Sequence, residues 1–208
     1  MNTHVLSLVT GPFQENAFLA WNDSDPNCII IDPGDDSEKI IQEIETHNLK
    51  PIAIVNTHAH LDHIGAVDSL KDHYQIPFYL HQDESDILEN FNISRQFYGL
   101  SPQAVPKVDF WFGDEEELSF GKIQIGLFKT PGHTPGGTCL IIDGHVFTGD
   151  TLFHRSIGRT DLPGGDFETL HSSLKKLVLE IPDTFILHPG HGPDTTLAVE
   201  KLENPYLK

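Results

Sequence analysis

The sequence has few cysteines, no long apolar run and few basic residues. Its two cysteines, Cys28 and Cys139, lie in apolar, strand-like segments, so we expect two buried free thiols in a reducing compartment rather than a disulfide. The longest apolar runs, such as residues 28–31, are far too short to span a bilayer. Residues 1–13 have no basic region and no long apolar core, which predicts no signal peptide and a cytoplasmic protein.

The low content of basic residues excludes some partners. Lys and Arg number 13 against 31 Asp and Glu, which gives a formal net charge of −18. A chain this acidic repels phosphate backbones and anionic lipid surfaces, so we expect neither a nucleic-acid nor a membrane partner. The hydrophobic fraction of 38% and the absence of repeats and linker-like stretches predict one globular domain over residues 1–208.

Strand-like and helix-like segments alternate in two similar blocks, residues 1–80 and 121–208. In the first block the patterns predict strands at 4–10, 16–21, 27–32, 51–56 and 76–80, and helices at 37–48 and 63–74. In the second block they predict a strand at 123–127, a hairpin of 138–143 with 145–148, a helix at 167–181, a strand at 184–188 and a short helix at 196–202. The simplest packing of two such blocks is two sheets face to face, with helices outside.

Three local features refine this outline. Asp35 and Glu38 have the spacing of a capping box at the start of the first helix. Asp166 is expected to cap the helix that begins at residue 167. Residues 81–121 are less regular and rich in aromatics, and we expect a flexible or capping segment there.

Histidine is abundant, with 13 residues, and its placement points to a metal site. Residues 57–63 read Thr-His-Ala-His-Leu-Asp-His, between a predicted buried strand and a predicted helix. In α/β folds, residues at the carboxyl ends of strands form the functional sites. Three imidazoles and a carboxylate suit zinc or another borderline cation.

Three later segments place similar side chains at strand ends. His133 lies in a Pro/Gly turn after a strand, Asp150 follows the strand that ends near residue 148, and His191 follows the strand that ends near residue 188. A single His or Asp in a loop is usually only solvated. However, His133, Asp150 and His191 all lie beside small residues, which allow segments of backbone to come close to one another. If the strand ends share one edge, seven ligands meet there, too many for one tetrahedral metal but suited to two metals that share Asp150. The seven are His58, His60, Asp62, His63, His133, Asp150 and His191.

Together with residues 31–35 (Ile-Asp-Pro-Gly-Asp), these segments resemble the five motifs of the metallo-β-lactamase superfamily, in order. The resemblance implies an α/β fold, a four-layer αββα sandwich, with a dinuclear site on the shared edge of its sheets. It implies that two groups of three residues each hold one metal: His58, His60 and His133, and Asp62, His63 and His191. Asp150 would bridge the metals. Asp32 would support the site without binding metal, although an Asp that opens an Asp-Pro-Gly turn explains it equally well.

Further stretches resemble the short glyoxalase II-like hydrolases within that superfamily. They are residues 149–153 (Gly-Asp-Thr-Leu-Phe), 158–166 (Gly-Arg-Thr-Asp-Leu-Pro-Gly-Gly-Asp), 192–196 (Gly-Pro-Asp-Thr-Thr) and 204–207 (Asn-Pro-Tyr-Leu). An Asp rather than a Cys at position 150 argues against the true zinc β-lactamases. The short stretch after His191 leaves no room for the C-terminal helical domain with which glyoxalase II helps to bind glutathione, so recognition of glutathione stays open.

The resemblance implies a dinuclear hydrolase whose partner is a small thioester, such as an S-2-hydroxyacylglutathione that is cleaved to glutathione and a 2-hydroxy acid. Zinc is the default for both divalent ions, and the His/Asp set also allows iron or manganese. Asp62 would orient the attacking hydroxide as well as bind metal. We expect Arg159 to contact a substrate carboxylate, and a salt bridge to Asp161 or Asp166 is its alternative role.

Two alternative functions remain at this point. The persulfide dioxygenases of the same superfamily also contain a Gly-Arg-Thr-Asp stretch and use a single iron. A non-catalytic protein with a structural metal is the other alternative, but structural zinc sites are usually four-coordinate and rich in cysteine, unlike this set. The sequence itself leaves the oligomeric state open.

Overall fold

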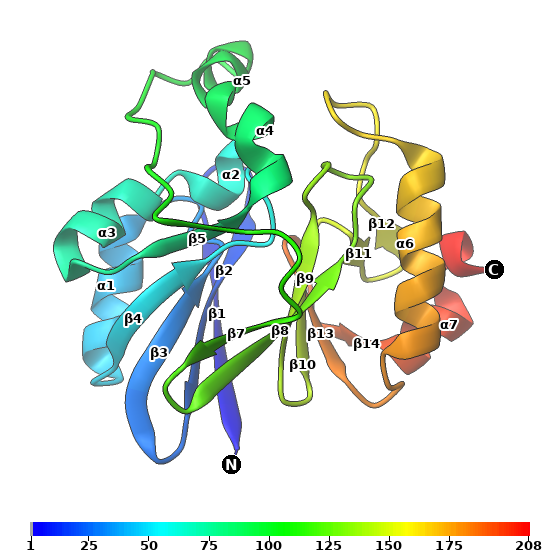
Figure 1. The fold of residues 1–208 in the computed structure, drawn as a ribbon, viewed down its shortest axis with the longest axis horizontal. Coiled ribbons are helices and arrows are strands. Elements are labelled where there is room, and N and C mark those ends of the chain that lie inside the picture. Colours follow the sequence, from blue (N-terminus) through cyan, green and yellow to red (C-terminus); the bar gives the residue numbers. More distant parts are fainter. Residues whose placement is uncertain (1) are drawn as a thin grey trace.

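The computed structural model describes residues 2–208 and contains two six-stranded sheets that pack face to face (Figure 1). Strands in the first sheet follow the order β1-β2-β3-β4-β5-β6. They are β1 (Thr3–Thr10), β2 (Glu15–Asn22), β3 (Asp25–Ile31), β4 (Lys50–Val55), β5 (Phe78–His81) and β6 (Phe110–Phe112). The first three strands pair antiparallel, and β3 to β6 pair parallel.

The second sheet follows the order β14-β13-β10-β9-β8-β7. It contains β7 (Glu117–Phe120), β8 (Ile123–Lys129), β9 (Thr138–Ile142), β10 (His145–Gly149), β13 (Ile186–Pro189) and β14 (Thr195–Thr196). β10 and β13 pair parallel, and the other neighbours pair antiparallel. A small separate hairpin consists of β11 (Leu152–Phe153) and β12 (Ser156–Ile157).

Helices cover the outer faces of both sheets. Figure 1 shows α1 and α3 beside the first sheet and α6 and α7 beside the second. The helices are α1 (Ser37–Thr46), α2 (Leu61–Ile64), α3 (Val67–Tyr74), α4 (Ser85–Glu89), α5 (Phe91–Phe97), α6 (Phe167–Glu180) and α7 (Leu197–Glu203), with 3₁₀ turns η1 (Gln82–Glu84) and η2 (Pro205–Leu207).

The two-residue period of the strands explains why each sheet is buried on both faces. In β3, Ile29 and Ile31 point into the core between the sheets, while Cys28 and Ile30 point into the core under α1 and α3. A third core lies between the second sheet and α6. Because side chains alternate along a strand, only a continuous apolar run fills two cores at once. The predicted αββα sandwich is therefore confirmed.

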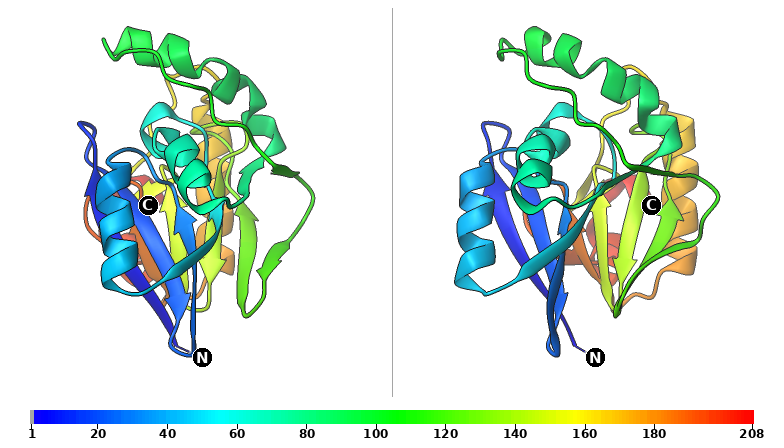
Figure 2. Two further views of the ribbon diagram at one scale, coloured as in Figure 1. Left: turned by 90° about the vertical axis from the view of Figure 1, so that its left-hand side faces the viewer. Right: turned by 60° about the vertical axis from the view of Figure 1, so that its left-hand side comes forward.

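Residues 81–121, expected to be a flexible or capping segment, connect the two sheets. The segment adds β6 to the first sheet and β7 to the second, and between β5 and β6 it forms η1, α4 and α5. In both views of Figure 2 these two helices, drawn in green, lie at the end of the sandwich opposite the N-terminus. The segment is thus a partly regular crossover between the sheets.

Two local predictions were wrong. The helix predicted at 63–74 breaks into α2 and α3 at residues 65–66, because the Ala66 N–H donates to the Pro33 carbonyl oxygen at 3.0 Å instead of continuing the helix. This close approach requires glycine at position 65, where a Cβ would come within 2.3 Å of the Gly34 carbonyl oxygen. The capping box does not form: Asp36 is the cap residue, with a φ of 49°. Its carboxylate instead accepts a hydrogen bond from the Gly11 N–H at 3.0 Å, which ties the start of α1 to the turn between β1 and β2.

Other local predictions are confirmed. The Asp166 carboxylate accepts a hydrogen bond from the Thr169 N–H at 2.7 Å and caps α6. Cys28 and Cys139 are buried free thiols, and burial raises the pKa of these thiols to about 12 and about 11. Among residues 2–208, no helix combines the length and the apolar character that crossing a bilayer requires.

Candidate metal centre

All seven sequence-predicted ligand residues lie at one edge of the sandwich. Residues 57–63 follow β4 and include α2, which carries Asp62 and His63. The second sheet supplies the rest: His133 from the loop between β8 and β9, Asp150 after β10 and His191 after β13. The sandwich therefore brings together ligands from both sheets.

The first group consists of His58, His60 and His133. One ligand atom of each lies within 4.8 Å of the others, and His60 Nδ1 lies 2.9 Å from His133 Nε2. His58 and His133 are buried. The same three residues were expected to hold the first metal, and the structure brings them together.

The second group consists of Asp62, His63 and His191, whose ligand atoms also lie within 4.8 Å of one another. His191 Nε2 lies 3.2 Å from Asp62 Oδ2. His63 is fully buried, while Asp62 and His191 are partly exposed. This group therefore borders solvent on one side, which is where a substrate can approach.

Asp150 lies between the two groups. Its Oδ1 is 3.3 Å from His63 Nε2 of the second group. Its Oδ2 is 3.5 Å from His133 Nε2 of the first group and 3.7 Å from His191 Nε2 of the second. One carboxylate thus faces both groups, which is the arrangement expected of a ligand that bridges two cations.

Asp32 orients this centre through hydrogen bonds. The buried carboxylate accepts from the Thr57 N–H at 2.7 Å and the Thr57 hydroxyl at 2.5 Å, and its Oδ2 lies 3.1 Å from His63 Nδ1. A hydrogen bond at Nδ1 leaves Nε2 of His63 free to face Asp150. Asp32, His58 and His63 also form a potential ligand cluster, but the Asp32 oxygens are already engaged, so a supporting role fits better.

Arg159 contributes its backbone to the centre. His133 Nδ1 lies 2.7 Å from the Arg159 carbonyl oxygen, which can only accept, so Nδ1–H donates and Nε2 faces the other ligands. The Arg159 side chain points elsewhere: Nε and Nη2 each donate to Asp161 at 2.7 Å. The predicted salt bridge with Asp161 is therefore present.

The charges of the centre shift its pKa values in opposite directions. Burial lowers the pKa of His58 well below its ordinary value, and burial with the neighbouring His133 lowers that of His60 to about 3. For His63, burial also disfavours the charged form, but the Asp150 and Asp32 carboxylates outweigh it and raise the pKa. For Asp150, burial acts upward, but the surrounding histidines hold the pKa below its usual range.

Several buried polar atoms of the centre lack hydrogen-bond partners, and this fits a metal site. Among the described residues they include His58 Nε2, His63 Nε2 and Asp150 Oδ1. Buried polar groups in proteins are rarely left unpaired. All three atoms belong to the nitrogen and oxygen donor set that zinc, iron and manganese accept, so the residues fit two divalent cations.

Two residues that support the centre carry no sequence signal of their own. The fully buried Glu84 accepts from the Ala59 N–H at 2.8 Å and the Gly136 N–H at 2.7 Å, and so joins the two loops that carry the first group. The Asn16 side chain donates to the carbonyls of Pro189 and Gly192, both at 2.9 Å, which fixes the loop around His191. All four hydrogen bonds join distant parts of the chain, so no local spacing indicates them.

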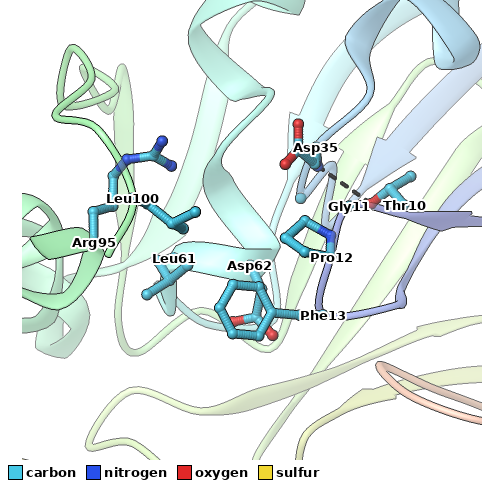
Figure 3. Close-up of a pocket in the computed structure, with 10 residues that line it drawn as sticks. Thr10, Gly11, Pro12, Phe13, Asp35, Leu61, Asp62, Arg95 and Leu100 are labelled. Carbon is cyan, nitrogen blue, oxygen red and sulfur yellow. Dashed lines mark hydrogen bonds between the residues drawn. The ribbon is translucent and has the colours of Figure 1, made fainter. Parts of the chain in front are cut away.

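A pocket borders the second group. Asp62 forms part of its wall, with Leu61 beside it (Figure 3). The rest of the wall comes from the turn between β1 and β2, from residues 34–35, and from Arg95 and Leu100. A substrate can therefore extend from the centre into this pocket.

The structure explains why residue 158 is glycine and predicts the effect of a side chain there. A Cβ at Gly158 would lie 1.8 Å from the Asp150 carbonyl oxygen and 3.1 Å from His133 Nδ1. We expect Gly158→Ala to move both ligands and to weaken metal binding by about ten- to a hundredfold, as loss of groups that orient ligands does. Titration of the metal-free protein with zinc measures this.

Gly144→Ala is the matched control, because a Cβ there meets nothing within 4 Å and the φ is not in the left-handed region. We expect its metal affinity to be unchanged. Equal affinities in the two variants would show that the Gly158 backbone does not position Asp150 and His133.

Comparison with known proteins places this geometry in a family. The sequence profile described as "Metallo-beta-lactamase superfamily" matches residues 10–195. The chain is 38% identical over 211 residues to "Hydroxyacylglutathione hydrolase GloC" of Haemophilus influenzae, across 100% of this chain and 98% of that protein.

Two solved structures are similar along their whole length. The "BLEG-1 B3 metallo-beta-lactamase" superposes with a TM-score of 0.93 at 39% identity, covering 99% of this chain and 100% of that one. "TTHA1623 in a di-iron-bound form" superposes with a TM-score of 0.84 at 40% identity, covering 97% and 100%. The chain therefore belongs to the metallo-β-lactamase superfamily, as a short metal-dependent hydrolase.

Proposed function

We propose that this protein is a dinuclear thioester hydrolase of the glyoxalase II-like type, which cleaves an S-2-hydroxyacylglutathione to glutathione and a 2-hydroxy acid. The observation that carries the proposal is the position of Asp150 between two groups of three ligand-type residues. The name of the relative GloC supports the reaction type. The buried free thiols are consistent with a cytoplasmic location.

In this proposal, His58, His60 and His133 would hold one cation, Asp62, His63 and His191 would hold the other, and Asp150 would serve both. When bound, two such cations lower the pKa of water and stabilise negative charge on the substrate oxygen. Zinc is the default, and the di-iron form of TTHA1623 makes iron the second choice.

The chain's own residues then orient the reactants. Asp62 lines the pocket as well as the second group, so its carboxylate is placed to orient the attacking water. Asp32 and the Arg159 carbonyl hold the imidazoles of His63 and His133 in one orientation. A centre that needs no rearrangement during the reaction favours the transition state. Attack by water forms a C–O bond, and the C–S bond then breaks to release the thiol.

β-Lactam hydrolysis is a second candidate, because the structure of BLEG-1, at 39% identity, is described as a B3 metallo-β-lactamase. The test compares purified, metal-loaded protein on S-lactoylglutathione and on the chromogenic β-lactam nitrocefin. We expect turnover of the thioester to exceed that of nitrocefin. Turnover of nitrocefin alone would favour the second candidate, and oxygen consumption with glutathione persulfide would favour a persulfide dioxygenase.

Replacement of the shared carboxylate tests the role of Asp150. Asp150→Ala leaves the two groups facing each other with one negative charge fewer, so metal content and thioester hydrolysis should fall together. We expect a loss of more than about a hundredfold, since removal of residues that only support ligands already costs about ten- to a hundredfold. Metal analysis and the thioester assay measure the two losses.

The exposed Asp114 provides the control, because Asp114→Ala removes the same charge at a fully exposed side chain. Thermal unfolding of Asp150→Ala should remain cooperative, since the three apolar cores do not include residue 150. Full metal content and full activity in Asp150→Ala would contradict the assignment.

We propose that Arg159 also contacts a substrate carboxylate, in competition with Asp161. Arg159→Ala should then lower kcat/KM roughly ten- to a hundredfold for a carboxylate-bearing thioester, with a smaller effect on a neutral one. Asp161→Asn weakens the competing contact and should lower KM for the charged substrate. Equal losses on both substrates in Arg159→Ala would show that the side chain only shapes its loop.

A further inference from the structure

The pocket beside Asp62 is lined by apolar side chains, by the two carboxylates of Asp35 and Asp62, and by one basic side chain. Pro12 and Phe13 of the turn between β1 and β2 form one wall, and Leu61 and Leu100 form others. Figure 3 shows the Arg95 guanidinium and the Asp35 carboxylate on opposite sides of the pocket, with Leu61 and Asp62 below them in this view. A molecule that reaches from the metal centre toward α5 therefore meets a cation at the far side.

Arg95 is held in position by contacts that leave part of its guanidinium free. Its Nε–H donates to the Ser101 carbonyl at 2.7 Å. The guanidinium carbon lies 5.4 Å from the centroid of the Phe91 ring, which is itself buried and anchors α5. In the described part of the chain, the Nη atoms of Arg95 have no hydrogen-bond acceptor and no carboxylate within 4.0 Å.

Arg95 differs in this from the two other arginines of the chain. Arg155 forms an ion pair with Glu203, and Arg159 forms two hydrogen bonds to Asp161. In a chain with a net charge of −18, carboxylates are the commonest available partners. An arginine at a pocket whose guanidinium is not paired with a carboxylate retains its capacity to bind one by two parallel hydrogen bonds.

The turn between β1 and β2 closes over this region from the opposite side. The rings of Phe13 and Tyr98 meet edge to face, with centroids 5.2 Å apart. Gly11 N–H is bonded to Asp36, which holds the turn against the start of α1. The pocket is thus bounded by two elements that touch through aromatic rings, and Arg95 provides the one cationic side chain among the residues that line it.

We propose that this pocket is a subsite for a carboxylate on the thiol arm of the substrate and that Arg95 is its specificity-determining residue. The inference rests on the proposed thioester hydrolysis. It assigns recognition of the thiol arm to α5, in the segment between the sheets. The acyl end of the substrate then lies at the metal centre, and the anionic thiol arm lies along Leu61 and Leu100 toward Arg95.

The test uses two thioesters that share the lactoyl group and differ in the thiol arm. S-Lactoylglutathione carries carboxylates on that arm, and S-lactoyl-N-acetylcysteamine carries none. We expect Arg95→Ala to lower kcat/KM for the first roughly ten- to a hundredfold, the usual effect of losing a charge-assisted hydrogen bond, and to leave the second within about twofold of wild type. Arg95→Lys keeps the positive charge but loses the planar guanidinium that forms two parallel hydrogen bonds. Its kcat/KM for S-lactoylglutathione should therefore lie between the values for wild type and Arg95→Ala.

Arg155→Ala is the control, because it removes an exposed arginine that is paired with Glu203. This variant should keep the wild-type kcat/KM for both thioesters. Because Arg95 is only partly buried and lies outside the three apolar cores, we expect Arg95→Ala to keep the metal content and melting temperature of wild type. Equal losses on both thioesters, or no loss on either, would overturn the assignment of the subsite.

A binding measurement separates this inference from the proposed reaction. S-Methylglutathione has the same thiol arm and no thioester, so calorimetry on the metal-loaded protein reports binding without turnover. If wild type hydrolyses neither thioester, the proposed reaction fails, but weakening of S-methylglutathione binding by about tenfold or more in Arg95→Ala would still support the subsite. Unchanged binding in that variant would overturn it.

Discussion

The central constraint on this structure is the burial of several metal-type donors at one edge of the sandwich without enough hydrogen-bond partners to satisfy them. His58 Nε2, His63 Nε2 and Asp150 Oδ1 are all buried and unpaired. Unpaired polar groups in a low-dielectric environment destabilise the folded state. Two cations bound by the two groups of ligands would provide partners for all three atoms.

This constraint accounts for the backbone around the centre. The ligands come from both sheets, so the two groups meet only when the sheets pack against each other through the apolar core between them. Hydrogen bonds from the Asn16 and Glu84 side chains hold the loops that carry the ligands. Glycine at position 158 lets the Arg159 carbonyl reach His133. The stability of the fold and the geometry of the centre are therefore linked.

Much of this arrangement is visible in the sequence, because its signals are local. The continuous apolar run at residues 52–55 predicts a buried strand, which is β4, and the ligand residues stand directly after strands. The cap at Asp166 is a contact over three residues and was predicted for the same reason. By contrast, the predicted capping box of Asp35 and Glu38 failed because α1 begins after Asp36, whose side chain bonds to Gly11, a residue distant in sequence.

The features that sequence could not reveal depend on tertiary contacts. The break at Gly65 depends on the approach of residue 34, and the role of Glu84 depends on two loops that lie far apart in the chain. The pocket is formed by the β1–β2 turn, α2 and α5, which are distant in sequence. Arg95 was not predicted as a site residue for this reason, whereas Arg159 was noticed because it lies in a motif.

The number of metal ions per chain tests the central claim most directly. Native mass spectrometry of the folded protein, after titration with zinc or with ferrous iron under anaerobic conditions, counts the ions that are bound. The account predicts saturation at two ions per chain, since two groups of three ligands share Asp150. Saturation at one ion with every metal offered would contradict the dinuclear centre.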